Sequence, residues 1–456
     1  MKRSTLNDVT MWFVAVYVAT LPLFLGGNRP LVWVGAMLVM AVFAFAYFIA
    51  LMIINDRLAI GASSIRIYLL LFGTFMAFQV VQTLPWLPAE LTALPDGFPQ
   101  VGTISIVPNE TWLAFARWFS FGGVAFFSLQ ACANRRRADR FFFLLFCIGL
   151  LQAVIGFLLY FQFNDASIIG KKWVYLGSLT GTFINRNTMA TFLASGAVLA
   201  IGVLTNNILT SGDMRNIRLE RLVKAALLPA AAFFLIIVDV SATNSRMGFL
   251  VTAIGVTAIS IMIATTLKRS LGKGGERPKR RSVWAIVVLG LLVLLAVLSS
   301  YGLGTLERLG GIDSSAEVRL NLYKQVVEVI LARPLTGFGG GAFASVFPFF
   351  HELPVSVDYI WDKAHNSYLA LWSEYGLVFG TIPILIVGLA TWQMARTLRS
   401  RPAVSSMAAI AVIILAAVHA LVDFSLEIQG YTVYFVAIVS CGLVRTFPAA
   451  RSEKSR

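Results

Sequence analysis

Apolar stretches, each close to the length that crosses a bilayer as a helix, recur along the whole 456-residue chain. A bilayer core offers no water to the backbone, so such stretches fold as helices. Hydrophobic residues make up 58% of the chain and charged residues only 13%, which excludes an ordinary soluble domain. Twelve spans are expected, at residues 11–26, 31–54, 67–84, 111–131, 141–163, 188–204, 223–240, 247–267, 283–301, 377–395, 407–422 and 431–444.

The net charge of +15 has to be read against this membrane topology. On a soluble chain it would indicate a nucleic-acid binder. Here most Lys and Arg lie in alternate connectors, and the most basic of these spans residues 268–281. Basic residues concentrate in cytoplasmic loops, so both termini are expected in the cytoplasm. The charge is therefore interpreted as topology and contact with anionic lipid, with no nucleic-acid partner.

The connectors on the opposite side are longer, at residues 85–110, 164–181 and 302–364. Val318, Leu322, Val326, Val329 and Ile330 recur at helical spacing, which predicts an amphipathic helix inside the third connector. Loops of this length usually carry function, so the working face is expected outside the cytoplasm. No internal repeat is evident, which lowers the case for a transporter. The expected division is spans one to nine over residues 1–301, an outer loop over 302–364, three spans over 365–446 and a cytoplasmic tail over 447–456.

Three arginines are expected at the outer ends of helices or in the outer loop: Arg186, Arg246 and Arg319. They could snorkel to headgroups or pair with Asp239, Glu317 or Asp423. Their Asn and Ser neighbours in apolar surroundings favour an anion site instead, because a guanidinium binds phosphate oxygens with two parallel hydrogen bonds.

His365 begins the segment HNSYLALWSEYGLVFG at the end of the long loop. On a helix, His365, Leu369 and Trp372 would share one face, with Tyr368 three residues on from His365. A structural role is the commoner fate of such a histidine. Its position beside Asn366, at the boundary of membrane and water, favours a general base.

Two further sequence patterns contain residues that could bind a ligand. His419 and Asp423 stand at helical i, i+4 spacing, where mutual hydrogen bonding is favoured over a proton relay or a cavity-lining role. The glycine-rich run at residues 335–343 predicts a tight turn, with Gly339 and Gly340 as possible amide donors to an anion. No HxxxH, CxxC or DxD pattern is present, so neither a metal nor a cofactor is expected, and Cys132, Cys147 and Cys441 are not expected to form a disulfide.

Taken in order, five segments resemble the O-antigen ligase and polymerase family of bacterial membrane glycosyltransferases. They are GTFINRNTMATF, the SATNSRMGFL segment, VRLNLYKQVVEVILARPLTGFGGGAF, HNSYLALWSEYGLVFG and HALVDF. The resemblance implies an all-α, polytopic fold of the GT-C type in the bacterial inner membrane, with the active site facing the periplasm. By position, Arg246, Arg319 and His365 match the family's essential arginines and histidine.

The implied reaction moves a glycan from undecaprenyl diphosphate to lipid A-core or a similar acceptor, without metal and with inversion. His365 could deprotonate the acceptor or bind the diphosphate. A polysaccharide polymerase and a protein O-oligosaccharyltransferase would share the donor site, and a transporter or lipid flippase is the alternative from another class. Residues expected to bind diphosphate or glycan are Arg186, Asn187, Asn366, Tyr368, Gly339, Gly340, His419 and Asp423.

Overall fold

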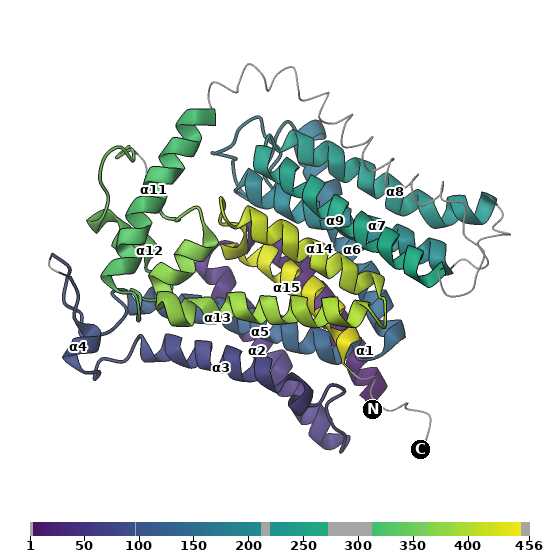
Figure 1. Cartoon of the computed structure of the whole chain (residues 1–456), viewed down its shortest axis with the longest axis horizontal. Coiled ribbons are helices and arrows are strands. Elements are labelled where there is room, and N and C mark those ends of the chain that lie inside the picture. Colours follow the sequence, from purple (N-terminus) through teal and green to yellow (C-terminus); the bar gives the residue numbers. More distant parts are fainter. Residues whose placement is uncertain (1–2, 96, 211–218, 272–311, 359, 448–456) are drawn as a thin grey trace.

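The computed structural model describes residues 3–95, 97–210, 219–271, 312–358 and 360–447, and helices are the regular secondary structure of these parts (Figure 1). The helices are α1 (Arg3–Thr20), α2 (Pro30–Ile53), α3 (Arg66–Val81), α4 (Ala89–Thr92), α5 (Pro108–Cys132), α6 (Arg135–Phe157), α7 (Arg186–Thr210), α8 (Leu219–Ala242), α9 (Arg246–Leu271), α11 (Ile312–Ala332), α12 (Phe343–Val346), α13 (Ser367–Leu398), α14 (Val404–His419) and α15 (Gln429–Leu443).

Within the described ranges, nine helical segments are long and apolar enough to cross a membrane. They confirm a polytopic, all-helical protein and correspond to nine of the twelve expected spans. The expected spans 407–422 and 431–444 fall on α14 and α15, which have 16 and 15 residues. The expected span 283–301 lies outside the described residues, so the total of twelve stays a prediction.

Helix α15 forms the centre of the bundle. Almost all of its residues are buried, as expected for a helix that is apolar all round. It packs against α14, α5, α6 and α13, so helices far apart in sequence share this one partner. Figure 1 shows α13, α14 and α7 running along a common axis around it. The ends of these helices therefore define two opposite faces of the bundle.

A second hydrophobic core lies outside the bundle. Helix α11 lies across one end of it in Figure 1 and contacts α13. The predicted amphipathic helix is confirmed, because Leu322 and Val326 on its expected apolar face are completely buried. They pack with Phe98 and Ile106 of the connector between α3 and α5. The two outer connectors thus fold onto each other.

The glycine-rich run forms the predicted turn and fits into a break in α13. Gly376 has φ 70° and interrupts the helical backbone. The Leu377 N–H there donates to the carbonyl oxygen of Pro334 at 2.7 Å. A Cβ on Gly337 would stand 2.4 Å from the Glu374 carbonyl oxygen, so only glycine allows this approach. Helix α13 begins at Ser367, and the break at Gly376 separates its first turns from the apolar span expected from residue 377.

Candidate functional site

Several helices begin or end at the end of the bundle that α11 covers. Helices α7, α9, α13 and α15 start there, and α8 and α14 end there (Figure 1). Most of the polar residues singled out in the sequence lie in these terminal turns. They form a connected set of hydrogen bonds.

Asn187 joins two of these helix starts to the connector after α14. Its Nδ2 donates to Asp423 Oδ1 at 3.0 Å, and its Oδ1 accepts from Ser245 Oγ at 2.8 Å. The Ser245 hydroxyl also accepts from the Gly248 N–H at 3.1 Å, which holds the first turn of α9. The starts of α7 and α9 are thereby fixed relative to Asp423.

His419 and Asp423 do not pair with each other directly, so the favoured expectation of mutual hydrogen bonding was wrong. Helix α14 ends at His419, and Asp423 lies in the turn beyond it. His419 Nδ1 instead bonds Thr191 Oγ1, which contacts Ser425 Oγ at 3.1 Å, and Ser425 donates to Asp423 Oδ2. The two residues are thus the ends of a chain that passes through two hydroxyl groups.

His365 precedes α13 and does not belong to it. Its φ of 52° is left-handed, so the expected shared face with Leu369 and Trp372 was wrong. The ring packs edge-on between Trp361 at 6.0 Å and Phe424 at 5.0 Å between ring centres. Nδ1 is buried and has no hydrogen-bond partner in the described part of the chain. The described part of the chain therefore leaves the hydrogen-bonding capacity of this nitrogen unused.

The charges around His365 are mixed. Burial lowers the pKa of His365. The negative charge of Asp423 raises this pKa, whereas the positive charge of Arg319 lowers it further. Arg319 therefore lies close enough to His365 and Asp423 to influence them. Within the described residues, Arg319 forms no hydrogen bond or ion pair, and Asp423 takes its hydrogen bonds from Asn187 and Ser425 rather than from an arginine.

Arg186 is the second guanidinium at this end. It lies over the ring of Tyr175 at 5.3 Å and donates to Ser178 Oγ at 3.4 Å. Burial raises the pKa of Tyr175, while Arg186 and Arg319 oppose the rise. Both arginines are thus near the same tyrosine. Arg246 is exposed at the first position of α9, directly after Ser245, at the edge of this set.

Four other expected ligands are engaged within the protein. The Asn366 side chain caps α13 by accepting from the N–H groups of residues 368 and 369, and its Nδ2 donates to Leu421 O. The Tyr368 hydroxyl donates to Ala417 O at 3.0 Å. The Gly339 N–H donates to Glu374 O at 2.9 Å, and Gly340 O accepts from Thr111. These contacts give the four residues a structural role. Their role as ligands stays a prediction.

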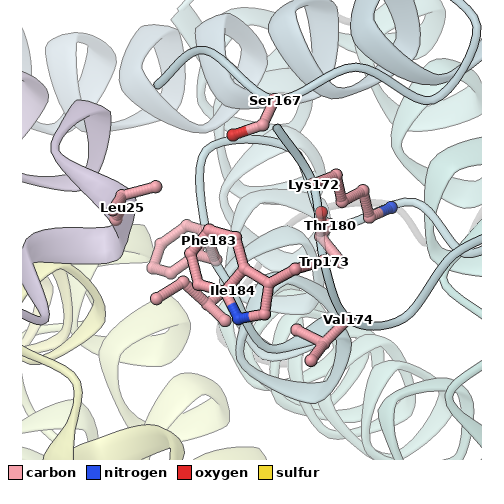
Figure 2. Close-up of a pocket in the computed structure, with 8 residues that line it drawn as sticks. All are labelled: Leu25, Ser167, Lys172, Trp173, Val174, Thr180, Phe183 and Ile184. Atoms are coloured by element: carbon pink, nitrogen blue, oxygen red, sulfur yellow. The ribbon is translucent and has the colours of Figure 1, made fainter. Parts of the chain in front are cut away.

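A pocket adjoins this site on the side of the 164–181 connector (Figure 2). Figure 2 shows Trp173, Phe183 and Leu25 around it. Lys172 lies at its edge, where it pairs with Asp165 and donates to Ser178 O at 2.6 Å. Its lining residues are Leu25, Ser167, Lys172, Trp173, Val174, Thr180, Phe183 and Ile184. The sequence did not predict this pocket: Phe183 and Ile184 belong to the GTFINRNTMATF segment, but the other lining residues carry no recognisable motif.

Other members of the hydrogen-bonded set were also missed from the sequence. Thr191 stands four residues after Asn187 within the same motif, so helical spacing could have identified it. Tyr323 and Ser425 carry no such signal, because each matters only through contacts with distant segments. Among the described residues, no three of His, Cys, Asp and Glu are grouped as metal ligands. The expectation of a metal-free reaction remains a prediction.

Comparison with protein families matches residues 231–384 to the model described as O-antigen ligase. The matched part runs from within α8 into α13 and contains Arg246, Arg319 and His365. Arg186, Asn187, His419 and Asp423 lie outside it, although Asn187 and Asp423 are hydrogen-bonded to each other at the same site. A comparison with curated proteins found no match.

Proposed function

Because residues 231–384 match the family model described as O-antigen ligase, we propose that the chain is a glycosyltransferase that uses undecaprenyl diphosphate as the carrier of its donor glycan. The family match supports an enzyme of the ligase or polymerase type. The specific reaction proposed is transfer to lipid A-core or a similar acceptor at the periplasmic face of the inner membrane, with inversion and without metal.

One observation carries this proposal: an imidazole whose buried Nδ1 has no hydrogen-bond partner among the described residues lies within electrostatic reach of an arginine at the end of the bundle. His365 supplies the imidazole and Arg319 the charge. Glycosyl transfer from a lipid diphosphate needs both a proton acceptor for the incoming hydroxyl and positive charge near the departing diphosphate. The proximity of the two residues supports their assignment to these two roles.

In the proposed step, the acceptor oxygen attacks the anomeric carbon while the bond from that carbon to the diphosphate oxygen breaks. His365 takes the hydroxyl proton, and the diphosphate leaves with the electron pair of the broken bond. Arg319 and Arg246 stabilise the negative charge that develops on the diphosphate. Because a guanidinium is always protonated and offers two parallel donors, this stabilisation is insensitive to pH near neutrality.

The arginines provide the test. Arg319→Ala and Arg246→Ala should each lower the transfer rate by roughly 10²- to 10³-fold, the usual cost of removing one donor to a developing oxyanion. Lysine should restore little, because an ammonium group lacks the planar fork. The measurement is glycan transfer by the purified variants from a lipid diphosphate donor to lipid A-core. Arg401→Ala, at an exposed position in the turn between α13 and α14, is the matched control.

Five outcomes would change the proposal. Full activity in either alanine variant removes that arginine from the mechanism. Activity that disappears with a chelator and returns with a divalent cation overturns the metal-free step. Elongation of the donor glycan in place of transfer to lipid A-core identifies a polymerase, transfer to a protein identifies an oligosaccharyltransferase, and translocation of the intact donor identifies a flippase.

A further inference from the structure

The segment around His365 is fastened to the connector between α14 and α15 by several hydrogen bonds. The Ser367 N–H donates to Ala420 O at 2.9 Å, and the Tyr323 hydroxyl contacts both His365 O at 2.9 Å and Leu421 O at 3.1 Å. These contacts offset the strain of the His365 backbone, because a non-glycine residue at φ 52° has an unfavourable left-handed conformation. The turn would relax if it were released.

A carboxylate holds this turn from both sides of the histidine. Glu427 Oε2 lies 3.5 Å from Lys363 Nζ, and Glu427 Oε1 accepts from Ser367 Oγ at 3.4 Å. Lys363 and Ser367 are the second residues before and after His365. The side chains of Lys363 and Glu427 are only 23% and 19% exposed, so water screens their attraction less than that of a surface pair.

Glu427 is itself anchored to the bundle. It ends the short helical turn η7 (Ser425–Glu427), in which its N–H donates to Phe424 O at 2.8 Å. Its carbonyl oxygen accepts from the guanidinium of Arg117 on α5, which lies over the Trp33 ring at 4.9 Å. Phe424 in turn packs edge-on against the His365 ring. Through these contacts, Glu427 fixes the segment around His365 relative to the helices of the bundle.

We propose that Glu427 is a positioning residue for His365, acting through Lys363 and Ser367 to hold the imidazole in its left-handed turn beside Asp423 and Arg319. The proposal rests on the proposed function for its catalytic consequence, but its structural part is independent of it. Neither Glu427 nor Lys363 would touch the reacting atoms.

The test compares Glu427→Ala, Glu427→Gln and Lys363→Met in the full-length protein. Diethyl pyrocarbonate modifies accessible neutral imidazoles, and mass spectrometry can follow each of the three histidines separately. We expect His365 to react several-fold faster in the alanine variant than in the unaltered protein. The glutamine variant should be intermediate, because it still accepts from Ser367 but does not attract Lys363. The rates of His351 and of the buried His419 should not change.

The catalytic arm measures transfer with the same variants. A displacement of about 1 Å can cost up to 10²-fold in rate, so kcat should fall in the order Gln then Ala while KM for the donor stays near its original value. Glu328→Gln, an exposed carboxylate on α11, is the matched control. If Glu427→Ala does not fold, the glutamine and Lys363→Met variants carry the test, since both keep side-chain volume.

The results separate the two proposals. His365 reactivity that is unchanged in both Glu427→Gln and Lys363→Met overturns the positioning role. An equal rise at His351 also overturns it, because it would show general loosening. A selective rise at His365 in the variants, together with an unaltered protein that transfers no glycan, supports the positioning role and contradicts the proposed function.

Discussion

At the scale of single residues, His365 has the most informative surroundings. Burial lowers its pKa from the ordinary value of 6.5, so the folded protein favours the neutral ring. Asp423 limits the shift and Arg319 and Lys363 add to it. A neutral imidazole at pH 7 is the form that a general base requires.

The pH dependence of transfer follows from this direction. We expect kcat/KM to fall as the pH is lowered through the depressed pKa of His365, at a pH below 6.5, because the protonated ring cannot accept the acceptor's proton. His365→Ala should be slow and should lose this acidic limb. The measurement is a pH–rate profile of both proteins.

A stability effect of the same sign has to be separated from this rate effect. The unfolded chain binds the histidine proton more tightly than the folded one, so folded stability also declines as the pH falls below 6.5. Unfolding curves at each pH identify the range in which the protein stays folded. If His365→Ala instead weakens donor binding and the unaltered protein shows no acidic decline, the histidine is a diphosphate ligand and not a base.

At the scale of elements, α11 is the part of the outer region that depends most on packing. Leu322 is completely buried in the outer core, whereas Leu320 on the same helix is 58% exposed. Leu322→Ala should cost about 2 to 5 kcal/mol, and Leu320→Ala should stay within about 0.5 kcal/mol. Because α11 also carries Arg319 and Tyr323, loosening it should reduce transfer.

Limited proteolysis measures this effect. Cleavage within residues 312–364 should become faster in Leu322→Ala than in Leu320→Ala, while the transmembrane fragments remain resistant. Equal cleavage in the two variants would contradict the view that the outer core holds α11 in place.

Helix α11 and the start of α13 show what the sequence could and could not predict about elements. The 3.6-residue period of the apolar residues was sufficient to predict α11, because these residues form one continuous buried face. The turns of α13 before Gly376 follow the helical spacing expected for the HNSYLALWSEYGLVFG segment, but a hydropathy window detects only the apolar part after Gly376. Asn366 was read as a ligand next to a helical His365, although an Asn followed by Ser367 also fits a helix N-cap.

At the scale of the whole molecule, the sequence predicted which residue types belong to the site. It did not predict which of these residues contact each other. The Asn187–Asp423 and Thr191–Ser425 contacts join residues more than 200 positions apart. Local spacing carries no information about such pairs, because they depend on which helices become neighbours. The same reason explains why Glu427 was missed, since its partners lie on another connector.

The orientation of the whole protein gives a further prediction. The turn between α13 and α14 is basic, so Ser400 is expected in the cytoplasm and Asp358 in the periplasm. Both positions are exposed. In cells with a permeabilised outer membrane, an impermeant thiol reagent should label Asp358→Cys and not Ser400→Cys. Cys147→Ser removes the one native thiol that is not fully buried. Labelling at position 400 alone would invert the orientation.

The central position of α15 has a consequence for biosynthesis. This helix is translated after every helix that it contacts, yet it fills the middle of the bundle. Helices α5, α6 and α14 must therefore enter the bilayer while the surfaces that will hold α15 still face lipid or the insertion machinery. Assembly of the bundle has to wait until α15 has been translated. A nascent chain arrested before α15 would be inserted but unassembled, and it would be a natural substrate for membrane quality-control proteases.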